Sequence, residues 1–188
     1  ALELARQAYR LRPQSGWVTA QLFDLQIRNG QWLDAQITND EQVCAHHTDK
    51  GVGRRRKAVL AFQQGLDASA AGDSEGAAKY YKIACNQDSA FTPAVVAFAN
   101  SLMDRHKNSK AADIIERAWR LQPHPDLVLP FWRSAEAGDG LAIMKATEQL
   151  ARANPAHPES KIALARAALE ARLWGEARTF LEAVTTDL

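Results

Sequence analysis

The sequence predicts an all-α protein, built as a right-handed superhelical stack of antiparallel helix hairpins. The observation that predicts it most directly is the segment 161–184, where apolar residues recur at three- and four-residue spacing in two successive stretches. The break between them, Arg172 to Gly175, is glycine-containing and too short to let the second helix leave the first. One hairpin cannot bury both of its apolar faces, so it requires neighbours of its own kind.

Similar segments along the chain supply those neighbours. One turn pattern, with alanine entering the following helix, occurs at 30–35, 72–77 and 173–177, and residues 8–13 are nearly duplicated at 118–123. The repetition has a period of about thirty-four residues, which is typical of paired-helix repeats.

We therefore expect one repeat array over residues 1–188. Its parts are predicted as a half-repeat at 1–12 and full repeats at 15–50, 54–89, 92–122, 124–154 and 158–184. Two irregularities stand out. Pro130 should kink or delay the first helix of its repeat, and the segment 36–53 is about eight residues too long, so it contains an extended helix or an inserted loop.

The first dozen residues carry an apolar stripe, Leu2, Ala5, Ala8 and Tyr9, with no preceding helix to cover it. End repeats normally present a polar capping face. We therefore expect the sequence to be a piece of a longer protein, and the exposed half-repeat to be a surface through which two copies could form a homodimer.

The composition excludes several classes of function. Apolar residues make up 46% of the 188 residues, and charged residues, 24%, nearly cancel to a net charge of +1. That balance argues against a general nucleic-acid footprint. No run of about eighteen apolar residues predicts a membrane span. Cys44 and Cys85 are too few for a disulfide framework, and we expect both to be buried free thiols.

A metal or catalytic centre is not expected. Cys44, His46 and His47 resemble half of a metal cluster, but no second Cys/His pair follows at the spacing of a zinc site, so surface or helix-end histidines are the expected interpretation. Carboxylates, serines and histidines show no catalytic arrangement. The sequence therefore predicts neither an enzyme nor a bound cofactor.

Four consecutive cations, Arg54, Arg55, Arg56 and Lys57, follow two glycines. A phosphate-binding loop would need a preceding strand and a lysine followed by Ser or Thr, and neither is present. We expect a flexible turn before a helix. The alternative is a basic patch for an acidic partner or anionic lipid head groups.

The tryptophans are expected mainly to pack. Trp32 and Trp174 occupy turn positions, where an aromatic ring would lie between the two helices of a hairpin. Trp17 and Trp132 fall on first helices, where core packing and contact with a partner both remain open.

The paired-helix repeat resembles the tetratricopeptide family, with consensus matches at Gly65, Ala84, Phe98, Ala118 and Pro123. The resemblance implies a concave groove, lined by first helices, that binds peptides or folded partners. By position, the groove residues would be Trp17, Asp24, Arg28, Phe62, Leu66, Ser69, Val96, Asn100, Asp104, Trp132, Ile162, Arg166 and Glu170. The family's carboxylate clamp is not expected, because Val96 and Phe62 stand where lysines would be needed.

Three shorter motifs resemble the C-terminal region of HemY-type proteins, which are bacterial inner-membrane proteins found with tetrapyrrole-biosynthesis genes. The motifs are the segment Arg55–Leu60 after a long second helix, the join Ala118–Asp126 and the turn Leu173–Arg178. The resemblance implies two hydrophobic spans upstream of Ala1, a repeat domain facing the cytoplasm, and a role in organising haem-pathway enzymes at the membrane.

The predicted function is thus a non-catalytic scaffold for protein partners, with haem-pathway enzymes as the partners that the resemblance implies. Aromatic and aliphatic groove residues would give affinity, and Asp24, Arg28, Asn100 and Asp104 would give selectivity. Two alternatives remain: a haem or tetrapyrrole carrier using Cys44, His46 or His47, and a docking module using residues 54–57 for lipid or nucleic acid.

Overall fold

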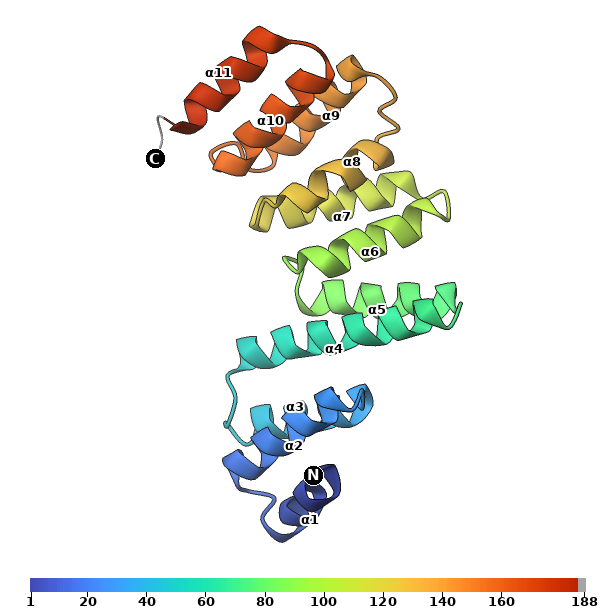
Figure 1. Cartoon of the computed structure of the whole chain (residues 1–188), viewed down its shortest axis with the longest axis vertical. Helices are drawn as coiled ribbons and strands as arrows, with labels where there is room; N and C mark the ends of the chain where they lie inside the picture. Colours follow the sequence, from blue (N-terminus) through green and yellow to red (C-terminus); the bar gives the residue numbers. More distant parts are fainter. Residues whose placement is uncertain (186–188) are drawn as a thin grey trace. The chain divides into compact units, whose positions relative to one another are not determined.

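The computed structural model describes residues 1–185, and this part of the chain is all helical, with no β-strand (Figure 1). The chain divides into two compact units, an N-terminal unit (Ala1–Asp88) and a C-terminal unit (Ser89–Leu188). The N-terminal unit contains α1 (Leu2–Leu11), α2 (Gly16–Arg28), α3 (Trp32–Cys44), α4 (Lys50–Ala70) and α5 (Ser74–Gln87). The C-terminal unit contains α6 (Thr92–Met103), α7 (Asn108–Leu121), the 3-10 turn η1 (Pro125–Leu127), α8 (Val128–Ser134), α9 (Gly140–Arg152), α10 (Pro158–Glu170) and α11 (Trp174–Thr185).

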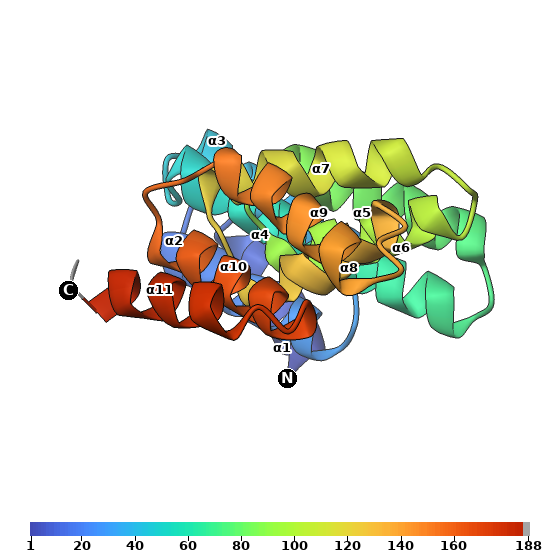
Figure 2. The ribbon, with the colours of Figure 1, turned by 90° about the horizontal axis from the view of Figure 1, so that it is seen from above.

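Within each unit, consecutive helices pack as antiparallel hairpins (Figure 1). In the N-terminal unit the hairpins are α2–α3 and α4–α5, and α3 also packs against α4. In the C-terminal unit they are α6–α7, α8–α9 and α10–α11, and Figure 2 shows α9, α10 and α11 side by side. The predicted all-α fold of tetratricopeptide-like helix hairpins is confirmed. No helix within the described residues has both the length and the apolar character needed to cross a membrane.

The first helix packs in the manner of a second helix of a hairpin. It lies against α2, and the Tyr9 hydroxyl donates a hydrogen bond to Glu41 of α3 at 2.8 Å, which raises the pKa of Tyr9. The stripe predicted to lack a cover is half-buried in this packing. The exposed apolar side chains of α1 are instead Leu4 and Leu11.

The five hairpin turns within residues 1–185 have the same backbone geometry. After the first helix of each hairpin, one residue adopts a positive φ; these residues are Gly30, Gly72, His106, Glu136 and Arg172. The next N–H then donates back to a carbonyl five residues earlier, as from Gln31 to Gln26 at 2.9 Å and from Leu173 to Ala168 at 2.8 Å. This is the Schellman motif, which satisfies carbonyls at a helix end. Gly175, predicted to lie in the break, is inside α11.

The predicted flexible turn at 54–57 is wrong, because these residues lie inside α4. The helix begins earlier, at Lys50, since the Asp49 carboxylate caps it by accepting the N–H of Gly51 at 2.6 Å. Hydrogen bonds from the N–H groups of Gly51 and Val52 lower the pKa of Asp49, because they stabilise the ionised form.

The extra length of the segment 36–53 is therefore divided between a loop, residues 45–49, and a 21-residue α4. The long helix of this region is a first helix, whereas the sequence predicted a long second helix. Gly53 lies where α4 approaches α3: a Cβ at this position would collide with the Val43 side chain. Glycine is required there for close packing.

Pro130 delays its helix, as predicted. The chain after α7 forms the short 3-10 turn η1 and then α8, which has only seven residues, with Pro130 in its first turn. A proline is tolerated there because N–H groups in the first turn have no intrahelical acceptor.

Each unit has its own core. In the N-terminal unit Phe23, Ala35 and Leu60 form a buried cluster against which Trp32 packs. In the C-terminal unit Trp119 is fully buried, and its indole N–H donates to Ser160 Oγ at 3.0 Å. Neither cysteine is in a disulfide; Cys85 is buried, and its burial raises the pKa of the thiol to about 12. Cys44 is exposed, so the expectation of burial was wrong for that residue.

Candidate functional site

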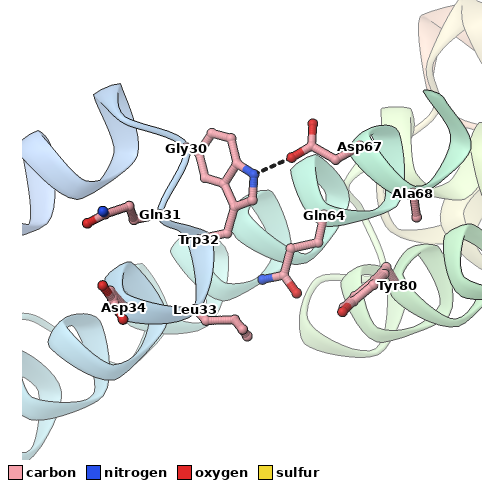
Figure 3. A pocket seen from close by; sticks show the side chains of 9 residues that line it. All are labelled: Gly30, Gln31, Trp32, Leu33, Asp34, Gln64, Asp67, Ala68 and Tyr80. Atoms are coloured by element: carbon pink, nitrogen blue, oxygen red, sulfur yellow. Dashed lines mark hydrogen bonds between the residues drawn. The ribbon is translucent and has the colours of Figure 1, made fainter. Parts of the chain in front are cut away.

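The candidate site is an open pocket in the N-terminal unit, between the start of α3 and the second half of α4 (Figure 3). Its volume is about 450 Å³, within the range of about 300–1,000 Å³ that is typical of ligand pockets. It is lined by Gly30, Gln31, Trp32, Leu33, Asp34, Gln64, Asp67, Ala68 and Tyr80.

The fold positions these side chains through the turn geometry and the helical repeat. The left-handed Gly30 ends the α2–α3 turn, so that Trp32 and Leu33 start α3 at the rim of the pocket. On α4, Gln64, Asp67 and Ala68 are spaced three and four residues apart, which places them on one face of the helix. Tyr80 of α5 completes the wall (Figure 3).

Gln64 contributes a polar group that the protein does not satisfy. Its side chain is 8% exposed, and its Nε2 is buried without a hydrogen-bond partner. A buried donor that is left unpaired lowers the free energy of unfolding by about 1–3 kcal/mol. Gln64 lines the pocket (Figure 3), and an acceptor that entered the pocket could satisfy Nε2 once the side chain turned this buried atom toward it.

The pocket lining contains two carboxylates, Asp34 and Asp67. Asp34 is neutralised by Arg6, whose Nη2 donates to Asp34 Oδ2 at 2.9 Å and to Gln31 Oε1 at 3.0 Å. Asp67 accepts the indole N–H of Trp32 at 2.6 Å. Asp67 has no cationic partner in the part of the chain that the structure describes, and no Lys, Arg or His lines the pocket. The site therefore has an uncompensated carboxylate.

The groove residues predicted for the N-terminal unit lie outside this pocket. They are Trp17, Asp24 and Arg28 on α2 and Phe62, Leu66 and Ser69 on α4. Trp17 is 72% exposed, so a partner could contact it. Phe62 instead packs within the unit, where its ring centroid lies 5.7 Å from that of Tyr81. The remaining four side chains are exposed.

The groove residues predicted for the C-terminal unit divide between its surface and its core. They are Val96, Asn100, Asp104, Trp132, Ile162, Arg166 and Glu170. Trp132 is buried, and its indole N–H donates to Thr147 Oγ1 at 2.7 Å, so core packing is the correct alternative. The Arg166 guanidinium lies 5.6 Å from the centroid of that ring. Asn100 accepts a hydrogen bond from Arg133 at 3.2 Å.

Of the two tryptophans expected to lie between helices, Trp32 packs against the core cluster in part, whereas Trp174 does not pack between helices. Trp174 is 66% exposed at the start of α11. Trp32 is half-buried: it packs against the core cluster and also lines the pocket. The fully buried tryptophan is Trp119, which the sequence did not single out.

The predicted basic patch is mostly engaged within the N-terminal unit. Its cations are Arg54, Arg55, Arg56 and Lys57. Within residues 1–185 Arg54 interacts electrostatically with Asp49, whose pKa it helps to lower. Arg55 pairs with Asp88, Arg56 lies 4.7 Å from the centroid of the Phe23 ring, and Lys57 pairs with Asp40 at 2.7 Å. The structure therefore offers little free positive charge here for lipid or nucleic acid.

Cys44, His46 and His47 lie exposed at the end of α3 and in the loop that follows it. His46 has a left-handed backbone with φ of 58°, and the His47 ring packs beside Gly16. Within the described residues, no three His, Cys, Asp or Glu side chains are grouped so that they could hold a metal ion. These residues do not line the pocket described above.

The sequence matches no protein-family model and no curated protein. Several solved structures are similar, and three of them are described next. YrrB, described as a TPR protein with an unusual peptide-binding site, is 12% identical with a TM-score of 0.46, covering 98% of this chain and 92% of that one. MamA is 14% identical with a TM-score of 0.40, covering 90% and 89%. TTC0263, a thermophilic TPR protein of Thermus thermophilus, is 17% identical with a TM-score of 0.37, covering 89% of each chain.

Sequence reasoning missed Gln64, Asp67 and Tyr80 as site residues. One signal was available: Gln64 is a polar residue at a core position, between Leu60, Ala61 and Gly65, which are all buried. A glutamine at such a position requires hydrogen-bond partners and therefore indicates either a network or a site.

Proposed function

We propose that this protein is a non-catalytic scaffold that binds a segment of a partner protein in the pocket of its N-terminal unit. The observation that carries the proposal is the pocket lining, which combines exposed apolar side chains with a buried, unpaired amide N–H. Binding sites combine an apolar wall with a few polar groups that fix the orientation of the ligand. A peptide offers matching chemistry, because it presents both side chains and backbone carbonyls.

The exposed residues of the first helices would extend this contact. Trp17, Asp24 and Arg28 on α2 are exposed and have no role in the core of their unit. An exposed tryptophan is the residue type most often found at the energetic centre of an interface. These residues remain proposed contacts of the groove that the tetratricopeptide resemblance implies.

Selection from a random dodecapeptide library on the immobilised chain tests the proposal. We expect specific peptides to be enriched, and their affinity to fall about tenfold, or 1.4 kcal/mol, in Leu33→Ala, because this exposed side chain lines the pocket. Ile37→Ala is the matched control: it is also exposed, one turn further along α3, and outside the pocket. Absence of enriched peptides, or equal loss in both variants, would contradict the proposal.

The resemblance to HemY-type proteins supports a more specific proposal, that the partners are haem-pathway enzymes at the bacterial inner membrane. Membrane contact would then come from a segment upstream of Ala1, with the repeats facing the cytoplasm. In pull-downs with purified haem-pathway enzymes, we expect capture that weakens in Trp17→Ala and persists in Trp174→Ala, since both tryptophans are exposed but only Trp17 is a proposed contact. Failure to retain any of these enzymes would rule out this partner class.

A further inference from the structure

Resting on the proposed function, we infer that the pocket of the N-terminal unit selects a basic residue, arginine or lysine, in an extended segment of the partner protein. The side-chain cation would lie against the Asp67 carboxylate and the Trp32 ring. The Gln64 side chain would turn its buried Nε2 toward the pocket, and the backbone carbonyl of the bound segment would accept a hydrogen bond from it.

The charge of the lining favours a cation. Its acidic side chains are Asp34 and Asp67, and no cation is among the nine lining residues. Arg6 already compensates Asp34 at 2.9 Å, whereas the partner of Asp67 among residues 1–185 is the neutral indole N–H of Trp32. An arriving cation would therefore find one free carboxylate, and an anionic ligand would be repelled by it.

The Trp32 ring is fixed in a position from which it can contact a bound cation. Its N–H donates to Asp67 Oδ2 at 2.6 Å, and its ring packs against the core cluster of Phe23 and Leu60. A fixed ring and a carboxylate joined by a hydrogen bond can contact the same cation. Contact of a cation with an aromatic face is strongest for tryptophan among the aromatic side chains.

Gln64 distinguishes a peptide from simpler cations. Its buried Nε2–H lacks an acceptor, and a polyamine or a metal ion would bring none. A basic residue within a peptide carries both groups that the pocket lacks, a cation on its side chain and a carbonyl on its backbone. Because the Gln64 and Asp67 side chains are one helical turn apart on α4, both groups of a single residue can reach them.

Synthetic versions of the peptides selected from the dodecapeptide library provide the test. We expect one position to be arginine or lysine, and replacement of that residue by neutral citrulline or norleucine to weaken binding at least tenfold. Asp67→Asn should cause a similar loss, since it removes the charge but keeps an oxygen that can accept the Trp32 N–H. Asp24→Asn, which neutralises an exposed carboxylate outside the pocket, should bind like the unmodified chain.

Gln64→Leu separates the second contact from the first. It preserves shape while removing the donor, so it should weaken the arginine peptide and its citrulline analogue by the same factor, about fivefold or more. Circular dichroism confirms that each variant is folded before its affinity is measured.

The outcomes separate this inference from the proposed function. Selected peptides without a basic residue, or undiminished affinity in Asp67→Asn, would overturn the inference and leave peptide binding intact. If the library yields no binding peptide, the proposed function and the inference fall together. A basic position that depends on Asp67 but not on Gln64 would overturn the carbonyl contact.

Discussion

Trp119→Ala is expected to lower the free energy of unfolding of the C-terminal unit by about 3–5 kcal/mol, the range found when a buried tryptophan or phenylalanine is truncated. Trp119 is 0% exposed, and its indole N–H joins α7 to Ser160 of α10 at 3.0 Å. Alanine would leave a cavity between these helices and remove the hydrogen bond. Urea unfolding of the chain, followed by circular dichroism, measures the loss.

Trp119→Phe separates the two contributions. It removes the N–H and only part of the ring volume that alanine removes, and Ser160 Oγ retains its own hydrogen bond to the Asn154 carbonyl at 2.6 Å. We therefore expect a clearly smaller loss than for alanine. Equal stability of the alanine variant and the unmodified chain would show that Trp119 is not packed as described.

Gly140→Ala is expected to destabilise the same unit by about 1–3 kcal/mol, the usual cost of inserting an atom into a packed contact. A Cβ on Gly140 would lie 2.5 Å from the Ala171 Cα and 2.9 Å from the Glu170 carbonyl oxygen. These are backbone atoms at the end of α10, so they cannot move aside as a flexible side chain would. A shifted urea midpoint with an unchanged slope would report the effect.

Gly138→Ala is the matched control, two residues earlier, in the loop that precedes α9. A Cβ there would meet no atom within 4 Å, so stability should change little. If both variants were equally stable, the close approach of α9 to α10 at this point would be contradicted.

The helix hairpins were predictable because apolar spacing and glycine-containing turns are local signals. Gly30 and Gly72 marked two of the turns directly, but His106 and Glu136 form the same left-handed turn without glycine. The Schellman motif is defined by backbone hydrogen bonds, and glycine only lowers the cost of the positive φ. Sequence inspection therefore finds the turns that have glycine and misses the others.

The start of α4 shows a second limit. Two glycines followed by cations suggested a turn, yet the Asp49 cap and the packing of Gly53 on Val43 extend the helix through them. Glycine lowers helix propensity by about 1 kcal/mol, which tertiary packing routinely overrides. The cations that suggested a patch instead contact side chains of the same unit, such as Asp40 and Phe23.

The pocket could not be predicted because its residues converge from separate helices. Trp32, Gln64 and Tyr80 are far apart in sequence, and their meeting depends on how α3, α4 and α5 pack. The pattern predicted that Trp32 packs between helices, which its contact with the core cluster supports, but it did not predict the hydrogen bond from the indole N–H to Asp67. The spacing of residues within one helix contains no information on which side chain of another helix this tryptophan meets.

The unpaired amide of Gln64 has a consequence for the evolution of this protein. Selection for thermal robustness alone would favour leucine at this position, where it could fill the same volume without an unmet donor. If the proposed partner segment binds in the pocket and satisfies this amide, the bound protein resists unfolding more strongly than the free protein. The melting temperature would then rise with the fraction of the protein that is bound, so it would report occupancy of the pocket.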